Sequence, residues 1–189
     1  MQAAMSSKKH SENGHVVKIV VSGPFGSGKT QFITTLSEID PVSTEIKLKS
    51  PDDQDTKIST TVGLDYGRMS MDNGRIIHLF GTPGQKRFDF MREVLAVGAH
   101  GLIILIDSTL DDTYHQAAQE IVDFFRERNS IPMLVCFTKQ DLPQARPVAE
   151  LEKVMDFPGS TPTLPIDATQ RQSAHQAVEK MLAILDGTA

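Results

Sequence analysis

The sequence predicts an α/β fold, with one mostly parallel β-sheet covered by helices. From residue 16 onward, short apolar runs of strand length alternate with longer stretches whose apolar residues recur at helical spacing. A glycine-rich turn at residues 23–30 directly follows the first apolar run, as expected between a strand and a helix. A hairpin pattern at residues 62–80 adds one antiparallel strand. A chain of 189 residues suffices for one such domain.

The spacing of apolar residues predicts each strand and helix. Six apolar runs predict strands, at residues 16–22, 62–71, 75–80, 102–107, 131–137 and 163–166. Between the second and third of these, Asn73-Gly74 predicts a type I′ turn, which needs positive φ angles. Two amphipathic stretches, at 116–128 and 173–185, predict surface helices with one buried face. The buried face of the first is expected to contain Ala117, Ile121, Phe124 and Phe125.

Two polar segments show no regular period. Residues 1–15 carry too little apolar surface to fold alone, so we expect a mobile N-terminal tail before a single domain at 16–189. Residues 40–61 contain Pro41 and Pro51 among polar neighbours. Loops of about twenty residues inside compact domains are usually functional or mobile. We therefore expect this segment to be a loop and a candidate switch.

Composition and charge narrow the classes of partner. The chain is 39% hydrophobic and 23% charged, and its net charge of −5 argues against a broad nucleic-acid or anionic-membrane surface. The single Cys136 excludes an internal disulfide and agrees with a reducing compartment. No apolar run reaches the ~18 residues of a membrane span, and no lipidation signal is present. We expect a cytoplasmic protein without a direct membrane anchor, whose partners are proteins and a nucleotide.

Residues 23–30 read Gly-Pro-Phe-Gly-Ser-Gly-Lys-Thr, which fits the phosphate-loop pattern G-x-x-x-x-G-K-[ST]. Glycines let the backbone curl until several N–H groups point at one phosphate, and the following helix presents the positive end of its dipole there. Lys29 is expected to reach the β- and γ-phosphates, and Thr30 to ligate Mg²⁺. The expected nucleotide-binding residues of this segment are Gly23, Phe25, Gly26, Ser27, Gly28, Lys29, Thr30 and Gln31.

A second motif, Thr138-Lys139-Gln140-Asp141, follows the predicted strand at 131–137. Ligands of open α/β sheets bind at such carboxyl ends of strands. The Asp141 carboxylate can accept hydrogen bonds from N1–H and N2–H of guanine, a donor pair that adenine lacks. Thr138, Lys139 and Asp141 are therefore candidate base-binding residues, with a preference for guanine.

A third motif, Phe-Gly-Thr-Pro-Gly-Gln-Lys-Arg-Phe, occupies residues 80–88, and Thr61-Val62-Gly63 lies at the end of the long polar segment. Taken with the two motifs above, their order and spacing resemble those of small Ras-like GTPases over roughly residues 16–185. The Gly-Thr-Pro-Gly-Gln sequence is similar, more narrowly, to bacterial members of that family, including the conservon-type GTP-binding proteins. The resemblance implies a P-loop NTPase fold with a six-stranded, mixed but mostly parallel sheet and helices on both of its faces.

The resemblance also implies roles for individual residues. Gly84 matches the glycine whose N–H senses the γ-phosphate, and Gln85 matches the glutamine that orients the attacking water. With Lys29, these two would be the catalytic residues. Thr61 matches the threonine that joins Thr30 in ligating Mg²⁺ when GTP is bound. The loop whose backbone contacts guanine is matched by Asp167, Ala168 and Thr169.

Cofactor and partners follow from the same resemblance. They are Mg²⁺, GTP as substrate and GDP as product, together with protein effectors and an activating protein, roadblock-type regulators among them. Two switch segments, near 55–66 and 81–98, would be ordered by the γ-phosphate and released by hydrolysis. A monomer or weak dimer is expected.

Several positions depart from the family pattern. Gly81 stands where an aspartate usually holds a Mg²⁺-bound water, so Mg²⁺ binding is expected to be weaker or differently supported. Phe25 stands where Ras has a glycine, and its ring is expected to crowd Gln85 and slow hydrolysis unless a partner supplies an arginine. Thr138 replaces an asparagine, which lowers the expected base affinity. Asp107 resembles a Walker-B aspartate, although related GTPases carry an acid there without a metal role.

Two other functions stay open at this point. A P-loop kinase acting on a small acceptor would need a lid and an acceptor pocket, and would prefer adenine. A non-hydrolysing nucleotide-bound scaffold agrees with Gly81 and Phe25 but not with Gln85. The apolar set after the second switch is expected to form part of the core or an exposed partner-binding patch, and it comprises Phe88, Phe90, Met91, Val94 and Leu95.

Overall fold

The computed structural model describes residues 15–40, 42–48, 60–84, 88, 90–128, 130–157 and 161–188, with the backbone alone at 42–48 and 60–63. The strands of this described part are β1 Val16–Ser22, β2 Val42–Leu48, β3 Thr60–Ser70, β4 Ile76–Gly81, β5 Gly101–Asp107, β6 Met133–Thr138 and β7 Thr163–Ile166. The helices are α1 Lys29–Leu36, α2 Phe90–Ala96, α3 Asp112–Arg128, α4 Val148–Val154 and α5 Arg171–Leu185.

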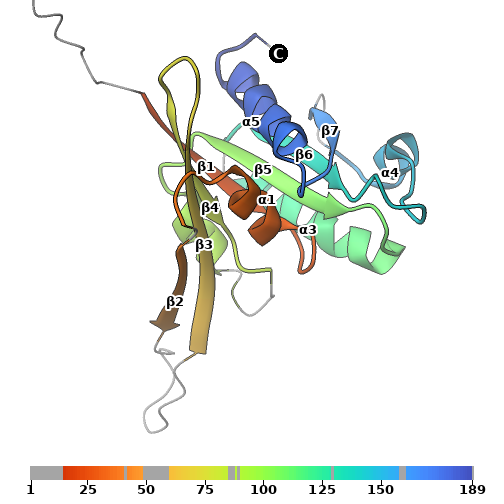
Figure 1. The fold of residues 1–189 in the computed structure, drawn as a ribbon. Helices are drawn as coiled ribbons and strands as arrows, with labels where there is room; N and C mark the ends of the chain where they lie inside the picture. Colours follow the sequence, from red (N-terminus) through yellow and green to blue (C-terminus); the bar gives the residue numbers. More distant parts are fainter. Residues whose placement is uncertain are drawn as a thin grey trace, which may run out of the picture.

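The strands form one sheet in the order β2-β3-β4-β1-β5-β6-β7 (Figure 1). β3 pairs antiparallel with both of its neighbours, and every other pair is parallel. The predicted mixed, mostly parallel sheet is therefore confirmed. All six predicted strands are present, with ends that differ from the expected ones by at most two residues, and β2 joins them at one edge.

β2 lies inside the segment 40–61, which we expected to be a loop. That expectation was wrong for residues 42–48, which pair with residues 60–66 of β3 and project with them from the body of the sheet (Figure 1). The missed signal is the sequence Val-Ser-Thr-Glu-Ile-Lys-Leu, in which apolar and polar residues largely alternate with a period of two. Residues 49–59 lie outside the described part of the chain.

The hairpin between β3 and β4 is confirmed, but its turn differs from the predicted one. Gly74 N–H donates to Met71 O at 2.8 Å, and Gly74 has a φ of 81°. Asn73 is not among the residues with positive φ, so the turn is not type I′. A turn closed by one left-handed glycine is the pattern of a longer hairpin loop, in which only the glycine needs positive φ.

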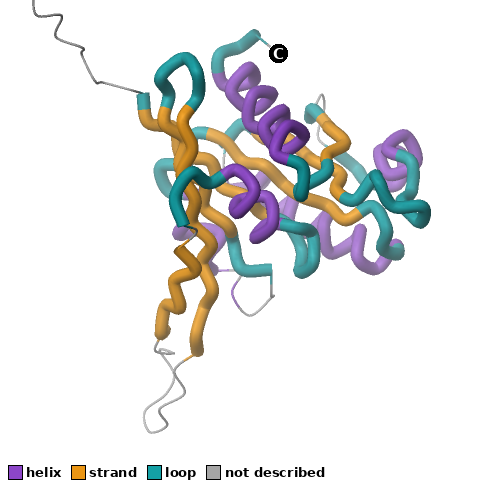
Figure 2. The backbone as a smooth tube through the Cα atoms, in the orientation of Figure 1, coloured by secondary structure: helices purple, strands orange, loops and turns teal. Residues whose placement is uncertain are grey.

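Helices lie on both faces of the sheet (Figure 2). Apolar side chains form a core between the sheet and the helices on each face. One core packs α1 and α5 against the sheet, and the other packs α2, α3 and α4. β5 is buried along its whole length and divides its side chains between the two cores. Ile103 and Leu105 belong to the first, and Leu102, Ile104 and Ile106 to the second.

The two predicted surface helices are present and begin two to four residues earlier than expected, at Asp112 and Arg171. The buried face predicted for α3 was only partly right. Ile121 and Phe125 are buried as expected, but Ala117 and Phe124 are only half-buried, and the buried face also includes His115, Ala118 and Val122.

None of the described helices is long and apolar enough to cross a lipid bilayer.

Candidate nucleotide-binding site

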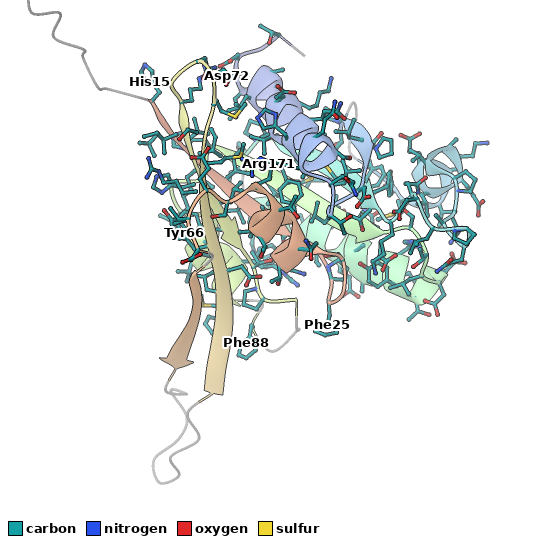
Figure 3. The ribbon with its side chains drawn as sticks, viewed as in Figure 1. His15, Phe25, Tyr66, Asp72, Phe88 and Arg171 are labelled. Atoms are coloured by element: carbon teal, nitrogen blue, oxygen red, sulfur yellow. The ribbon has the colours of Figure 1, made fainter. Side chains whose placement is uncertain are left out.

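The three predicted nucleotide-binding segments lie together at the carboxyl ends of the parallel strands β1, β6 and β7. Parallel strands place their carboxyl ends together, so the loops that follow them meet. Residues 23–30 follow β1, residues 138–141 follow or end β6, and residues 167–169 follow β7. Phe25 lies at the tip of the first of these loops and points away from the sheet (Figure 3).

The phosphate loop requires its glycines for conformational and steric reasons. Gly26 and Gly28 have φ angles of 82° and 96°, in the region that L side chains rarely adopt. Gly23 has a φ of 140°, and a Cβ there would lie 2.2 Å from Leu105 O of the neighbouring strand. The loop is thus pressed against β5, and Gly28 begins helix α1 in a left-handed conformation.

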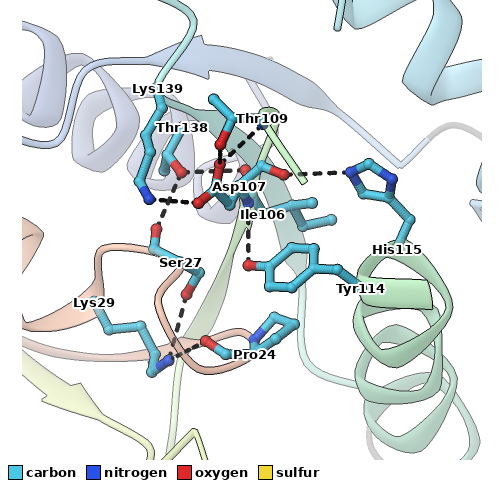
Figure 4. A network of polar contacts seen from close by, with 10 residues as sticks. All are labelled: Pro24, Ser27, Lys29, Ile106, Asp107, Thr109, Tyr114, His115, Thr138 and Lys139. Atoms are coloured by element: carbon cyan, nitrogen blue, oxygen red, sulfur yellow. Dashed lines mark hydrogen bonds and ion pairs between the residues drawn. The ribbon is translucent and has the colours of Figure 1, made fainter. Parts of the chain in front are cut away.

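Lys29 folds back over the loop. Its Nζ donates to Gly23 O at 2.8 Å. It also donates to Pro24 O at 2.6 Å and lies 3.3 Å from Ser27 Oγ (Figure 4). Burial lowers the pKa of the Lys29 ammonium to about 8, against an opposing effect of the Asp65 carboxylate. The loop therefore holds a buried cation at the place where the sequence predicts phosphate binding.

Side-chain contacts join the other two segments to the phosphate loop. The Thr138 hydroxyl lies 3.0 Å from Ser27 O and 3.2 Å from Ile106 O, so its one proton is shared between the two carbonyls (Figure 4). The Ala168 Cβ lies 3.6 Å from the position that a Cβ on Gly28 would take. Thr138 thus braces the loop rather than facing outward, a role that the sequence did not predict.

Asp107, at the end of β5, forms the centre of a buried polar network. Its carboxylate accepts hydrogen bonds from Lys139 Nζ and from the backbone N–H and hydroxyl of Thr109 (Figure 4). Burial opposes ionisation of this side chain, but these donors outweigh it and lower the pKa of Asp107. The carboxylate thus binds the ammonium of Lys139, whose backbone has a positive φ of 62°.

The base-binding candidates Asp141 and Asp167 lie on the two flanking loops. Asp141 is exposed in the turn after β6. The Asp167 carboxylate instead accepts hydrogen bonds from the N–H and hydroxyl of Thr169, at 2.8 and 2.6 Å, and so shapes its own loop. Gln31 is exposed on α1, where its amide donates to Thr35 Oγ1 at 3.0 Å.

Gly84, the predicted γ-phosphate sensor, lies directly against the phosphate loop. A Cβ on Gly84 would lie 2.8 Å from Phe25 Cα and 3.1 Å from Lys29 Nζ, so only glycine fits this approach. Gln85 lies outside the described residues. The backbone of Thr61 lies in β3, paired with Lys47, and its side chain is outside the described part.

Sequence reasoning missed Asp65, which contacts the site from β3. Its Oδ2 accepts a hydrogen bond from Thr30 Oγ1 at 2.6 Å. Within the described residues no group of three or more His, Cys, Asp or Glu side chains could hold a metal by itself. Mg²⁺ is usually bound by one or two protein oxygens together with phosphate oxygens, and Thr30 beside Asp65 fits that kind of site.

Comparison with known proteins gives the family of the chain. A family model described as "Conserved hypothetical ATP binding protein" matches residues 44–188. The chain belongs to this family. It is 32% identical over 126 residues to the uncharacterized protein MJ1339 of Methanocaldococcus jannaschii, covering 67% of this chain and 71% of that protein.

Two further likenesses concern small GTPases and related proteins. The mutual gliding-motility protein MglA of Myxococcus xanthus is 28% identical over 151 residues, covering 74% of this chain and 75% of MglA. The nucleotide-bound small GTPase Arl6 of Trypanosoma brucei shares the fold, with a TM-score of 0.70 at 18% identity over 92% of this chain and 99% of that one. With matches to Arf-like and Ras-related proteins, these findings support a place among the small Ras-like GTPases.

Proposed function

We propose that this protein is a guanine-nucleotide-binding switch that hydrolyses GTP to GDP slowly and requires Mg²⁺. The observation that carries the proposal is the convergence of three loops at one edge of the sheet. Thr138 contacts the phosphate loop at Ser27, and Ala168 lies beside the loop at Gly28, where its Cβ is 3.6 Å from the position that a Cβ on Gly28 would take. The residues proposed to bind phosphate and those proposed to bind the base thus lie side by side, which supports binding of one nucleotide.

The choice of base rests on Asp141. The family description speaks of ATP, and its match begins at residue 44, beyond the phosphate loop. Asp141 is an exposed hydrogen-bond acceptor in the turn after β6. The last residue of β6, Thr138, is hydrogen-bonded to the phosphate loop. A carboxylate there pairs with the N1–H and N2–H donors of guanine, whereas adenine offers an unprotonated N1 and no 2-amino group. We therefore favour guanine, with adenine as the competing assignment.

The surroundings of the phosphate loop are the basis for proposing that GTP hydrolysis is slow. Gly84 lies beside Lys29, where its N–H would meet a γ-phosphate, and Gln85 follows it in sequence. Phe25 is 75% exposed at the loop tip, where an incoming arginine of an activating protein would have to pass. Arginine-assisted phosphoryl transfer adds about 10³–10⁵ in rate, so without such a partner we expect slow turnover.

A protein effector is proposed for the outer face of α2. The apolar set divides here: Phe88, Met91 and Leu95 are buried, whereas Phe90 and Val94 are exposed. Val97, one turn further, is 75% exposed. Three apolar side chains at helical spacing next to a switch form a surface of the kind that binds a partner. We place this interaction in the cytoplasm, as the free, buried Cys136 suggests.

The test is to identify the nucleotide that copurifies with the full-length chain and then to follow GTP and ATP in single-turnover assays with Mg²⁺. We expect bound GDP or GTP, slow release of phosphate from GTP, and none from ATP. Tight guanine binding without cleavage would favour a scaffold over a GTPase. Cleavage of ATP alone would overturn the guanine assignment and support the adenine one.

A further inference from the structure

The turn that carries Asp141 is attached at both of its ends to the end of β5 and the residue that follows it. At the start of the turn, the Lys139 ammonium binds the carboxylate of Asp107, the last residue of β5. At its other end, the backbone N–H of Arg146 donates to Ser108 O at 2.9 Å. Asp141 lies between these two attachments, so both help to decide where its carboxylate lies relative to the sheet.

Hydrogen bonds within the turn make residues 139–146 one compact unit. Leu142 N–H donates to Lys139 O at 3.1 Å, and Ala145 N–H donates to Leu142 O at 3.0 Å. The side-chain amide of Gln140 donates to Arg146 O at 2.9 Å and so joins the two ends of the turn. A displacement of Arg146 should therefore move the whole turn.

The side chain of Arg146 contacts both of the helices that flank the turn. Its Nε and Nη2 lie 2.9 and 2.8 Å from Glu150 Oε1, in the first turn of α4. Its Nη1 donates to the carboxylate of Asp112, the first residue of α3. Because a guanidinium presents its donors in fixed directions, these contacts set the orientation of the group as well as its position.

His115 is a third partner of the guanidinium and connects it to Asp107. Arg146 Nη1 lies 3.3 Å from His115 Nδ1, and His115 Nε2 lies 3.3 Å from Asp107 O (Figure 4). An arginine can only donate and a carbonyl can only accept, so the ring is neutral with its proton on Nε2. Burial lowers the pKa of His115 and favours this neutral form. Arg146 and Lys139 are thus both joined to Asp107, from opposite ends of the turn.

From these contacts we propose that Arg146 is a positioning residue for base recognition, which holds Asp141 where its carboxylate meets both donors of guanine. The inference rests on the proposed function, because it supposes that guanine binds at Asp141. A binding group has to be held within about 0.5 Å of its productive place by the residues around it. Loss of the Arg146 contacts should therefore change the choice of base more than the binding of the phosphates.

The deciding experiment compares GDP with inosine diphosphate, whose base lacks the 2-amino group of guanine. Each is used to displace a fluorescently labelled GDP from the full-length protein, which gives the two dissociation constants side by side. We expect the wild-type protein to prefer GDP by about tenfold or more, because inosine loses one hydrogen bond to a charged group. Arg146→Gln should lower this preference at least about threefold, since the displaced carboxylate no longer meets both donors.

Arg75→Gln is the matched control. Arg75 also forms an ion pair, with Asp186 at 2.8 Å, and its side chain is 26% exposed, against 23% for Arg146. It precedes β4 at the amino ends of the parallel strands β1 and β4, whereas the turn lies at the carboxyl end of β6. This control should keep the wild-type preference for GDP even where its melting temperature falls. If Arg146→Gln also kept that preference, its role would be structural alone, and the inference would be overturned.

A double-mutant cycle tests whether Arg146 acts through Asp141. In an Asp141→Ala background the turn offers guanine no carboxylate at position 141. Arg146→Gln should then change the affinity for GDP by less than about twofold, because the residue through which it acts is gone. An equal loss of affinity in both backgrounds would contradict the proposed role.

Arg146→Lys serves where the glutamine variant does not fold. Lysine keeps the positive charge but lacks the planar fork that reaches Asp112, Glu150 and His115 together. This variant should also show a lowered preference for GDP, and a wild-type preference would refute positioning by the guanidinium. Failure of the wild-type protein to bind GDP at all would instead overturn the proposed function, and the role of Arg146 with it.

Discussion

Burial of the Lys29 side chain, which is 8% exposed, makes its charge depend on pH close to neutrality. Burial lowers its pKa to about 8, the Asp65 carboxylate opposes this, and the Arg92 charge adds to it. Phosphate beside Nζ favours the charged ammonium and raises the pKa again. Nucleotide binding should therefore take up a proton whenever Lys29 is partly neutral in the free protein.

Calorimetric titration of GDP in buffers of different ionisation enthalpy measures this uptake. With a pKa of about 8 in the free protein, we expect uptake of about half a proton at pH 8 and about a tenth at pH 7. Affinity should accordingly fall as the pH rises above 8. Lys29→Arg stays charged throughout and should lose the uptake. Equal uptake in the variant would assign the proton to another group.

Helix α1 carries Lys29 and Thr30, so its packing on the sheet sets where they lie. Gly67 of β3 makes that packing possible, because a Cβ there would lie 2.7 Å from Ile33 Cγ2 and 3.1 Å from Ser37 Cβ. Arg171 of α5 secures the other end of α1 by donating to Thr35 O and Leu36 O, at 3.0 and 3.2 Å. The loop and the helix thus form one rigid support for the site.

Gly67→Ala should lower the free energy of unfolding by about 1–3 kcal/mol, because α1 has to move away from the sheet. Urea unfolding of the nucleotide-free protein measures the change. The same substitution in an Ile33→Ala background should cost less, since the closest clashing atom is gone. A cost that is equal in both backgrounds would show that Ile33 is not the obstacle.

The pairing of strands also decides which parts of the site the sequence could reveal. The phosphate loop and the motif ending in Asp141 are contiguous, and their meeting follows from the parallel sheet. The contact of Asp65 with Thr30, by contrast, depends on which residue of β3 stands opposite Gly81. The sequence pattern predicts neither that register nor the hydrogen bond from Lys139 to Asp107, because each joins residues that are far apart in the chain.

At the scale of the whole molecule, the loops that follow β1, β6 and β7 bring the residues proposed to bind phosphate and base together at the carboxyl ends of the parallel strands. The alternation of six strands with covering helices followed from apolar patterning, whereas the strand order did not, and the fold matches that of the small GTPase Arl6. β2 was missed because its alternation lies within a polar segment. It adds to the sheet at the edge next to β3, the strand that carries both Thr61 and Asp65.

The central claim is that the loops after β1, β6 and β7 bind guanine nucleotides. The most direct test measures how well unlabelled GDP and ADP each displace a fluorescently labelled GDP from the protein. With Mg²⁺ present, we predict that GDP binds at least about tenfold more tightly than ADP, because adenine leaves the Asp141 carboxylate without its two donors. Asp141→Asn should weaken GDP binding and favour xanthosine diphosphate, whose 2-oxo group accepts from the new amide, whereas Asp156→Asn should change neither. Equal or tighter binding of ADP by the wild-type protein would contradict the account.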